Sequence, residues 1–206
     1  MPAEFAGYGE RLRELHPEWE VREWRSSADL PLQLLQNRRL YDRAMDVCPR
    51  DWKRFRSGLL RLEFLWIYGG IYVDCDVEPL RPFDELLSLE AFACWSPNRW
   101  KGQRLLTDSV IGAEPGHPFI GAAMAGVEES IEVFSHRPTA VASGPCNLSR
   151  TQASGDWPSL TLLPERAFGP QSNRDRDRGR PVDLTGSFGW HRWANSRDKR
   201  HGGVPQ

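Results

Sequence analysis

A helical segment that runs straight into two glycines, a short apolar strand and two aspartates constrains this 206-residue chain most strongly. The run 54–68 has apolar residues at helical spacing, and the glycine pair at 69–70 suits the end of a helix. Residues 71–74 then read as a strand that leads to Asp74 and Asp76. Because residues i and i+2 of an extended chain point to the same side, both carboxylates are expected to face one point.

Two carboxylates with open positions beside them suit Mn²⁺ or Mg²⁺ that also binds a substrate phosphate. Such an ion neutralises the charge that grows on a leaving diphosphate. An isolated Asp-x-Asp is more often a pair of solvated loop carboxylates, so the neighbouring residues decide the interpretation. Arg61 lies among apolar residues of the predicted helix, and its planar guanidinium suits a phosphate close to Asp74 and Asp76.

These residues resemble the DXD-containing sugar-binding region of family 32 glycosyltransferases. The family includes fungal mannosyltransferases, bacterial capsule and polysaccharide enzymes, and relatives of the clostridial glucosylating toxins. The resemblance rests on identity and spacing at Ser57, Arg61, Leu65, Gly69, Gly70, Tyr72, Asp74 and Asp76. It implies a GT-A-like fold and a metal-dependent, retaining transfer from a nucleoside diphosphate sugar to an acceptor that the sequence does not identify: a sugar, a lipid-linked molecule or a protein.

Three later blocks, at 108–119, 143–145 and 191–196, resemble the same family. The resemblance implies that Asp74, Asp76 and Arg61 are the catalytic residues and that His191 completes the metal shell. Packing against Trp193 would also explain His191. The donor contacts implied by the resemblance come from Ser57, Gly69, Gly70, Tyr72, Asp108, Gly144, Pro145 and Ser196.

The chain departs from the family pattern at several positions. Gly58 stands where the family has an aspartate that helps hold the donor sugar, and Asp108 stands where it has an asparagine. We therefore expect weak donor binding or an unusual sugar, and we expect Gly58→Asp to raise donor hydrolysis without destabilising the fold. We also expect the family's opening strand to be absent before the run 19–24, which resembles its second strand.

Alternating strand and helix patterns predict a single layered α/β domain with a mostly parallel sheet over residues 1–198, followed by a disordered tail at 199–206. Charge alternation at 173–181 predicts a mobile loop. The expected helices span 4–15, 32–45, 51–68 and 117–134, and the expected strands span 19–24, 71–74, 91–95, 109–113 and 160–163.

The composition narrows the function classes. A net charge of −1 gives no general attraction to nucleic acid, and four widely spaced cysteines form no zinc motif. Without a signal peptide or an apolar run of membrane-spanning length, we expect a cytoplasmic protein or one recruited to a membrane surface. Two alternatives stay open: a degenerate nucleotide-sugar-binding module, and an Asp-x-Asp phosphatase. The phosphatase is disfavoured because Glu78 stands where that class needs Thr or Val.

Overall fold

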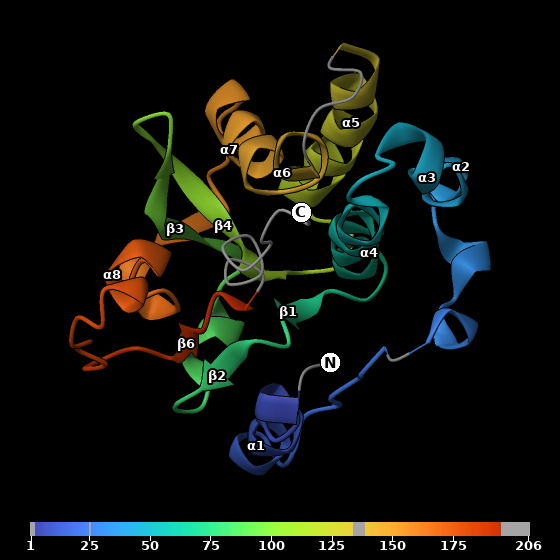
Figure 1. Ribbon diagram of the computed structural model, residues 1–206. Coiled ribbons are helices and arrows are strands. Elements are labelled where there is room, and N and C mark those ends of the chain that lie inside the picture. The colour runs from blue at the N-terminus through green and yellow to red at the C-terminus, as the bar shows by residue number, and fades with distance from the viewer. Residues whose placement is uncertain (1–2, 25, 134–138, 195–206) are drawn as a thin grey trace, which may run out of the picture.

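The structure is a computed structural model that describes residues 3–24, 26–133 and 139–194. A four-stranded sheet in the order β1-β4-β3-β5 forms its centre (Figure 1). Its strands are β1 (Gly70–Val73), β3 (Ala91–Trp100), β4 (Gln103–Ala113) and β5 (Leu160–Leu163). A second, two-stranded sheet pairs β2 (Val77–Pro79) with β6 (Gly189–His191).

The α/β prediction is confirmed, whereas the mostly parallel sheet is wrong. Among the described strands, β1 and β3 both run antiparallel to β4, and the one parallel pair of the central sheet is β3 with β5. The physical reason lies in the short connection between β3 and β4. Lys101 and Gly102 both take positive φ values, 49° and 81°, and so close a tight hairpin, which forces neighbouring strands to run antiparallel.

The central sheet separates two apolar clusters because side chains alternate along β3. Ala91 and Ala93 join the larger cluster, beneath helices α4 (Trp52–Tyr68), α5 (Pro118–Val133) and α7 (Pro145–Ser154). Phe92 and Cys94 join the smaller cluster on the opposite side, together with Val77 of β2 and Phe188 beside β6. Figure 1 shows the same division, with the helices above the sheet and the small sheet below it.

Helix α4 positions the start of the central sheet. Its buried face carries Phe55, Leu59, Leu62 and Leu65, the helical spacing that the sequence shows. Gly69 ends the helix at φ 64°, and its N–H donates to the carbonyl of Leu65 at 2.9 Å. A Cβ there would lie 2.5 Å from the ring of Pro115, so both the backbone conformation and the close packing require glycine.

The remaining helices are short. They are α1 (Tyr8–Leu15), α2 (Arg38–Asp42), α3 (Ala44–Val47), α6 (Thr139–Ala142) and α8 (Asn173–Asp177). The helix expected at 32–45 is therefore divided into a 3-10 turn at Leu32–Leu34 followed by α2 and α3. None of the described helices is long and apolar enough to cross a membrane.

Two local expectations are wrong. The run 19–24 is not a strand, because its aromatic side chains bind other elements: the Trp19 indole donates to Asp84 at 3.2 Å, and the Trp24 ring lies 4.7 Å from that of Phe64. The segment expected as a mobile loop contains α8, whose N-cap Ser172 accepts a hydrogen bond from the N–H of Asp175. The expected tail at 199–206 lies outside the described residues.

Candidate functional site

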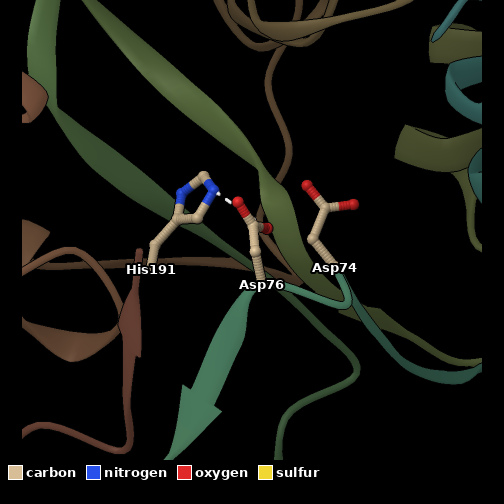
Figure 2. Close-up of side chains that lie close together, drawn as sticks. All are labelled: Asp74, Asp76 and His191. Atoms are coloured by element: carbon tan, nitrogen blue, oxygen red, sulfur yellow. Dashed lines mark ion pairs between the residues drawn. The ribbon is translucent and has the colours of Figure 1, made fainter. Parts of the chain in front are cut away.

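The two aspartates lie in the turn that joins the central sheet to the small sheet. The N–H of Asp74 donates to the carbonyl of Ser109 at 2.8 Å, which continues the pairing of β1 with β4 by one residue. The N–H of Val77 then donates to the carbonyl of Asp74 at 3.0 Å, which closes a turn before β2. The chain at Asp74–Asp76 is thus turned rather than extended, yet both carboxylates still face the same region, as Figure 2 shows.

His191 reaches these carboxylates from the far end of the chain, because β6 pairs with β2 so that His191 lies opposite Val77. One ligand atom from each of Asp74, Asp76 and His191 lies within 4.8 Å of the others. The His191 Nε2 atom is 3.3 Å from Asp76 Oδ1 (Figure 2). Adjacent ligands that each bind an ion at about 2.1 Å lie about 3 Å apart, so this spacing fits a shared Mn²⁺ or Mg²⁺.

The chemistry of the three side chains also fits such an ion, since carboxylates suit Mg²⁺ and Mn²⁺ and neutral imidazole is a common metal ligand. The other ring nitrogen, Nδ1, is buried and has no hydrogen-bond partner among the described residues. The Trp193 ring packs on the imidazole at 4.0 Å. His191 therefore packs against Trp193 and also directs Nε2 at Asp76.

The backbone of the C-terminal segment binds Asp76 directly. The N–H of Ala194 donates to Oδ2 at 2.8 Å, and the N–H of Arg192 donates to the Asp76 carbonyl at 2.9 Å. Burial alone would raise the pKa of the Asp76 carboxyl, but the hydrogen bond and charge of His191 and the Ala194 N–H outweigh it, so the pKa lies below its usual value. Asp76 is thus a buried, ionised carboxylate at neutral pH.

Asp74 belongs to a different network, built around Arg61 of α4. Arg61 Nη2 donates to Asp74 Oδ1 at 3.0 Å, Arg61 Nη1 donates to Asp108 Oδ2, and the Tyr72 hydroxyl donates to Asp74 Oδ1 at 2.6 Å. The Arg61 guanidinium also lies over the Tyr72 ring, 4.6 Å from its centre. Arg61 is only 5% exposed, and its Nε atom has no described partner. The structure thus connects, in one network, four of the residues that we expected at the site from the sequence: Arg61, Tyr72, Asp74 and Asp108.

Burial is the main cause of a raised pKa at Asp74, and Asp108 adds to it, while Arg61 opposes both. Burial alone would lower the pKa of Arg61, but the Asp108 and Asp74 carboxylates, together with the Tyr72 hydroxyl, outweigh it and raise that pKa well above its ordinary value. Arg61 is thus a permanent cation between two carboxylates. It leaves Asp74 Oδ2 and Asp108 Oδ1 outside these hydrogen bonds.

The other residues for which we expected donor contacts lie in several places. Gly69 packs against Pro115, and Gly70 lines an apolar pocket with Ile71, Leu87 and Phe92, at the end of β1 opposite Asp74. Ser57 is exposed on α4, whereas Gly144 and Pro145 begin α7. Ser196 lies outside the described residues.

Gly58 corrects one sequence expectation. A Cβ at Gly58 would lie 2.6 Å from both the backbone oxygen and the Oγ of Ser143, just before α7. The space for the family's aspartate at this position is thus filled by the Ser143 backbone, and the expectation that Gly58→Asp leaves the fold intact is wrong.

Sequence reasoning missed the contribution of Ala194 and of Arg176. A backbone N–H such as that of Ala194 has no signature in a sequence. Arg176 is one cation of an alternating charge run, although its guanidinium binds the segment that follows β6.

Residues 2–93 match the family described as "Glycosyltransferase sugar-binding region containing DXD motif". An alpha-1,4-N-acetylglucosaminyltransferase of Homo sapiens is 33% identical over 89 residues, which cover 43% of this chain and 24% of that protein. Inositol phosphoceramide mannosyltransferase 3 of Schizosaccharomyces pombe (strain 972 / ATCC 24843) is 28% identical over 127 residues, covering 58% of this chain and 32% of that protein.

The matched regions thus span less than a third of either curated relative. Among solved structures, the PaToxG glycosyltransferase aligns with a TM-score of 0.46 at 15% identity, over 62% of this chain and 43% of that one. Over residues 2–93, the family match confirms the resemblance drawn from the sequence, and this region includes the helix, the glycine pair and both aspartates. Residues 2–93 of this chain are therefore similar to the DXD-containing sugar-binding region of glycosyltransferases.

Proposed function

We propose that this chain is a metal-dependent glycosyltransferase with a GT-A-like fold, which moves a sugar from a nucleoside diphosphate sugar to an acceptor. The observation that carries the proposal is the convergence of Asp74, Asp76 and His191 within 4.8 Å. Asp74 and Asp76, the DXD motif of the matched family, lie in the turn that joins the two sheets, and His191 lies on β6 of the small sheet. Both curated relatives are named as sugar transferases, which supports the reaction class.

In this proposal, Asp76 and His191 hold Mn²⁺ or Mg²⁺ together with the donor diphosphate. When bound, the ion stabilises the negative charge that develops on the leaving diphosphate. The lowered pKa of Asp76 keeps its carboxylate ionised for this role. Asp74 Oδ2 is available to bind the ion through water or to accept hydrogen bonds from ribose or sugar hydroxyls, because its Oδ1 is held by Tyr72 and Arg61.

Arg61 acts in this account chiefly by holding carboxylates in place. Its Nη atoms bind Asp74 and Asp108, which fixes both side chains beside the proposed donor site. Asp108 Oδ1 is then free to accept a hydrogen bond from a donor hydroxyl. We infer retention of anomeric configuration from the family resemblance, and the leaving phosphate is the proposed acceptor of the proton from the incoming hydroxyl.

A second candidate is a binding module that holds metal and donor without turnover. The observation that favours it is Gly58, because Ser143 fills the space in which the family's aspartate would contact the sugar. A phosphatase using Asp74 as nucleophile is disfavoured, since Tyr72 and Arg61 both bind the Oδ1 atom of that carboxylate.

The proposal is tested with a panel of nucleoside diphosphate sugars and Mn²⁺, measuring free sugar and nucleoside diphosphate released by the wild type. Asp76→Asn is the test variant, and Asp156→Asn, at an exposed aspartate in the loop after α7, is the matched control. We expect hydrolysis or transfer by wild type and control, and loss of it with Asp76→Asn or a chelator. Binding of metal and donor without product would indicate the module, and turnover by Asp76→Asn equal to wild type would refute the metal mechanism.

A further inference from the structure

Helix α8 binds the segment that carries the metal-ligating histidine. The Nη1 atom of Arg176 donates to two successive backbone carbonyls, those of Arg192 at 2.6 Å and Trp193 at 2.7 Å. Both residues directly follow His191. An arginine that is shared between adjacent carbonyls fixes the path of the backbone between them, because its planar donors set direction as well as distance.

The opposite edge of the same guanidinium is held by Asp177. The Nε and Nη2 atoms of Arg176 donate to Asp177 Oδ1 at 3.1 and 2.6 Å. The Arg176 side chain is 12% exposed, which limits its motion into solvent. The guanidinium is therefore held between a carboxylate on its own helix and the backbone of the C-terminal segment.

The clamped backbone is the one that binds Asp76. The Arg192 N–H donates to the Asp76 carbonyl, and the Ala194 N–H donates to Asp76 Oδ2 at 2.8 Å. Between them, Trp193 takes a φ of 54°, a conformation that a non-glycine residue holds only when its surroundings enforce it. Two contacts enforce it here: the Arg176 bond to the Trp193 carbonyl, and the Trp193 indole N–H donating to the carbonyl of Gln171 at 2.9 Å.

Helix α8 is itself tied to the rest of the molecule. Ser172 caps its start, with Oγ accepting from the Asp175 N–H at 3.1 Å. The N–H of Asn173 donates to Asn98 Oδ1, in the β3–β4 hairpin, at 3.2 Å. A continuous set of hydrogen bonds thus runs from that hairpin through α8 and residues 192–194 to Asp76.

We propose that Arg176 is a positioning residue of the metal centre, acting through residues 192–194 on Asp76. By fixing the Ala194 N–H on Asp76 Oδ2, it leaves Oδ1 directed at His191 Nε2, where the two atoms are 3.3 Å apart. Arg176 thereby selects the carboxylate oxygen that is presented to the ion. The proposal rests on the metal centre proposed above. It adds that α8, which touches none of the three ligands in the described contacts, sets the affinity of that centre.

If Arg176 had a purely structural role, substituting it would change the stability of the protein but would leave the metal affinity of the folded protein unchanged. Arg176→Ala is therefore compared with Arg174→Ala, an exposed arginine two residues earlier on the same helix. Arg176→Lys keeps the charge but supplies a single ammonium instead of a planar fork, and is expected to recover part of the effect. Asp177→Asn keeps the arginine and removes the carboxylate that holds its other edge.

Two readouts are measured on folded protein: Mn²⁺ affinity, from the electron paramagnetic resonance signal of the free ion, and hydrogen exchange at the Ala194 amide. We expect Arg176→Ala to weaken Mn²⁺ binding about 10-fold, as for other groups that orient a metal ligand. We also expect faster Ala194 exchange, with Asp177→Asn intermediate and Arg174→Ala unchanged. Wild-type affinity and exchange in both Arg176→Ala and Asp177→Asn would overturn the proposal.

If the Arg176→Ala variant fails to fold, the Mn²⁺ affinity and the Ala194 exchange of the Asp177→Asn variant decide whether the proposal holds. Absence of Mn²⁺ binding by wild type would refute the metal centre instead, and Ala194 exchange would still show whether Arg176 fixes the contact with Asp76.

Discussion

At the scale of single residues, the two aspartates of the DXD motif have opposite surroundings. Asp76 receives hydrogen bonds from the His191 ring and the Ala194 N–H, which hold its pKa below the usual value, whereas burial raises the pKa of Asp74. Asp74 already shares its Oδ1 between Tyr72 and Arg61. In the proposed metal site, we therefore expect Asp76 to be the stronger ligand of the two and Asp74 the weaker.

This difference predicts unequal effects of the two substitutions. Asp76→Asn removes the ionised ligand next to His191 and should weaken Mn²⁺ binding about 100-fold, whereas Asp74→Asn should weaken it about 10-fold. Isothermal titration calorimetry on folded protein, with Asp156→Asn as control, measures both. Equal losses for the two variants would show that the carboxylates share the ion evenly.

Gly58 gives a prediction about stability. A methyl group there meets a backbone oxygen that cannot move away easily, so Gly58→Ala should lower the free energy of unfolding by about 1–3 kcal/mol. Gly7→Ala is the matched control, since a Cβ at Gly7 meets nothing within 4 Å. Urea denaturation compares the two. A Gly58→Ala protein as stable as wild type would mean that the contact with Ser143 relaxes without cost.

At the scale of elements, the sequence predicted those whose signal is local. Helix α4, the glycines that end it and the strand that follows lie within about 20 consecutive residues. A sequence window of this length is long enough to show the helical spacing of apolar residues. The strand β6 has only three residues and forms by pairing with β2, a distant segment. The local sequence therefore does not predict it. The strand prediction at 19–24 is wrong for the opposite reason. The run has a pattern that suits a strand, but its aromatic side chains bind Asp84 and Phe64 instead of joining a sheet.

Glu63 of α4 connects that helix to the start of α2. Its buried carboxylate accepts the N–H groups of Gln36 at 2.9 Å and Asn37 at 2.7 Å. Glu63→Ala leaves both donors without this partner and should cost about 2 kcal/mol, with Glu63→Gln less harmful because it keeps one acceptor oxygen.

Thermal unfolding and hydrogen exchange over residues 36–42 measure the Glu63 effect. Glu132→Ala, on the exposed side of α5, serves as control. If the exchange rates over 36–42 match those of wild type, the carboxylate does not hold this segment.

At the scale of the whole molecule, the candidate site joins elements that are far apart in the sequence. Asp74 and Asp76 lie between the two sheets, and His191 arrives on a strand near the end of the described chain. Sequence reasoning placed these three residues together through a family resemblance. It did not foresee that Arg61 would bind Asp74 and Asp108, or that α8 would hold residues 192–194, since both depend on contacts between distant segments.

Because the proposed ligands come from segments far apart in the sequence, metal binding should stabilise the entire fold. Free Mn²⁺ at 100 times its dissociation constant should add about 2.7 kcal/mol, which raises the melting temperature of a protein of this size by about 5–10 °C. Differential scanning fluorimetry with Mn²⁺, and then with excess chelator, tests this. The shift should be reversed by the chelator and be much smaller for Asp76→Asn. A shift of equal size in that variant would place the stabilising ion elsewhere.

The central claim is that Asp74, Asp76 and His191 hold one divalent ion together. The most direct measurement is pulsed electron paramagnetic resonance of Mn²⁺ bound to the protein with a nucleoside diphosphate, which detects coupling to an imidazole nitrogen ligand. The account predicts one Mn²⁺ per chain with nitrogen coupling in wild type, and loss of that coupling with weaker binding in His191→Ala. Bound Mn²⁺ without nitrogen coupling, or the same coupling in His191→Ala, would contradict it.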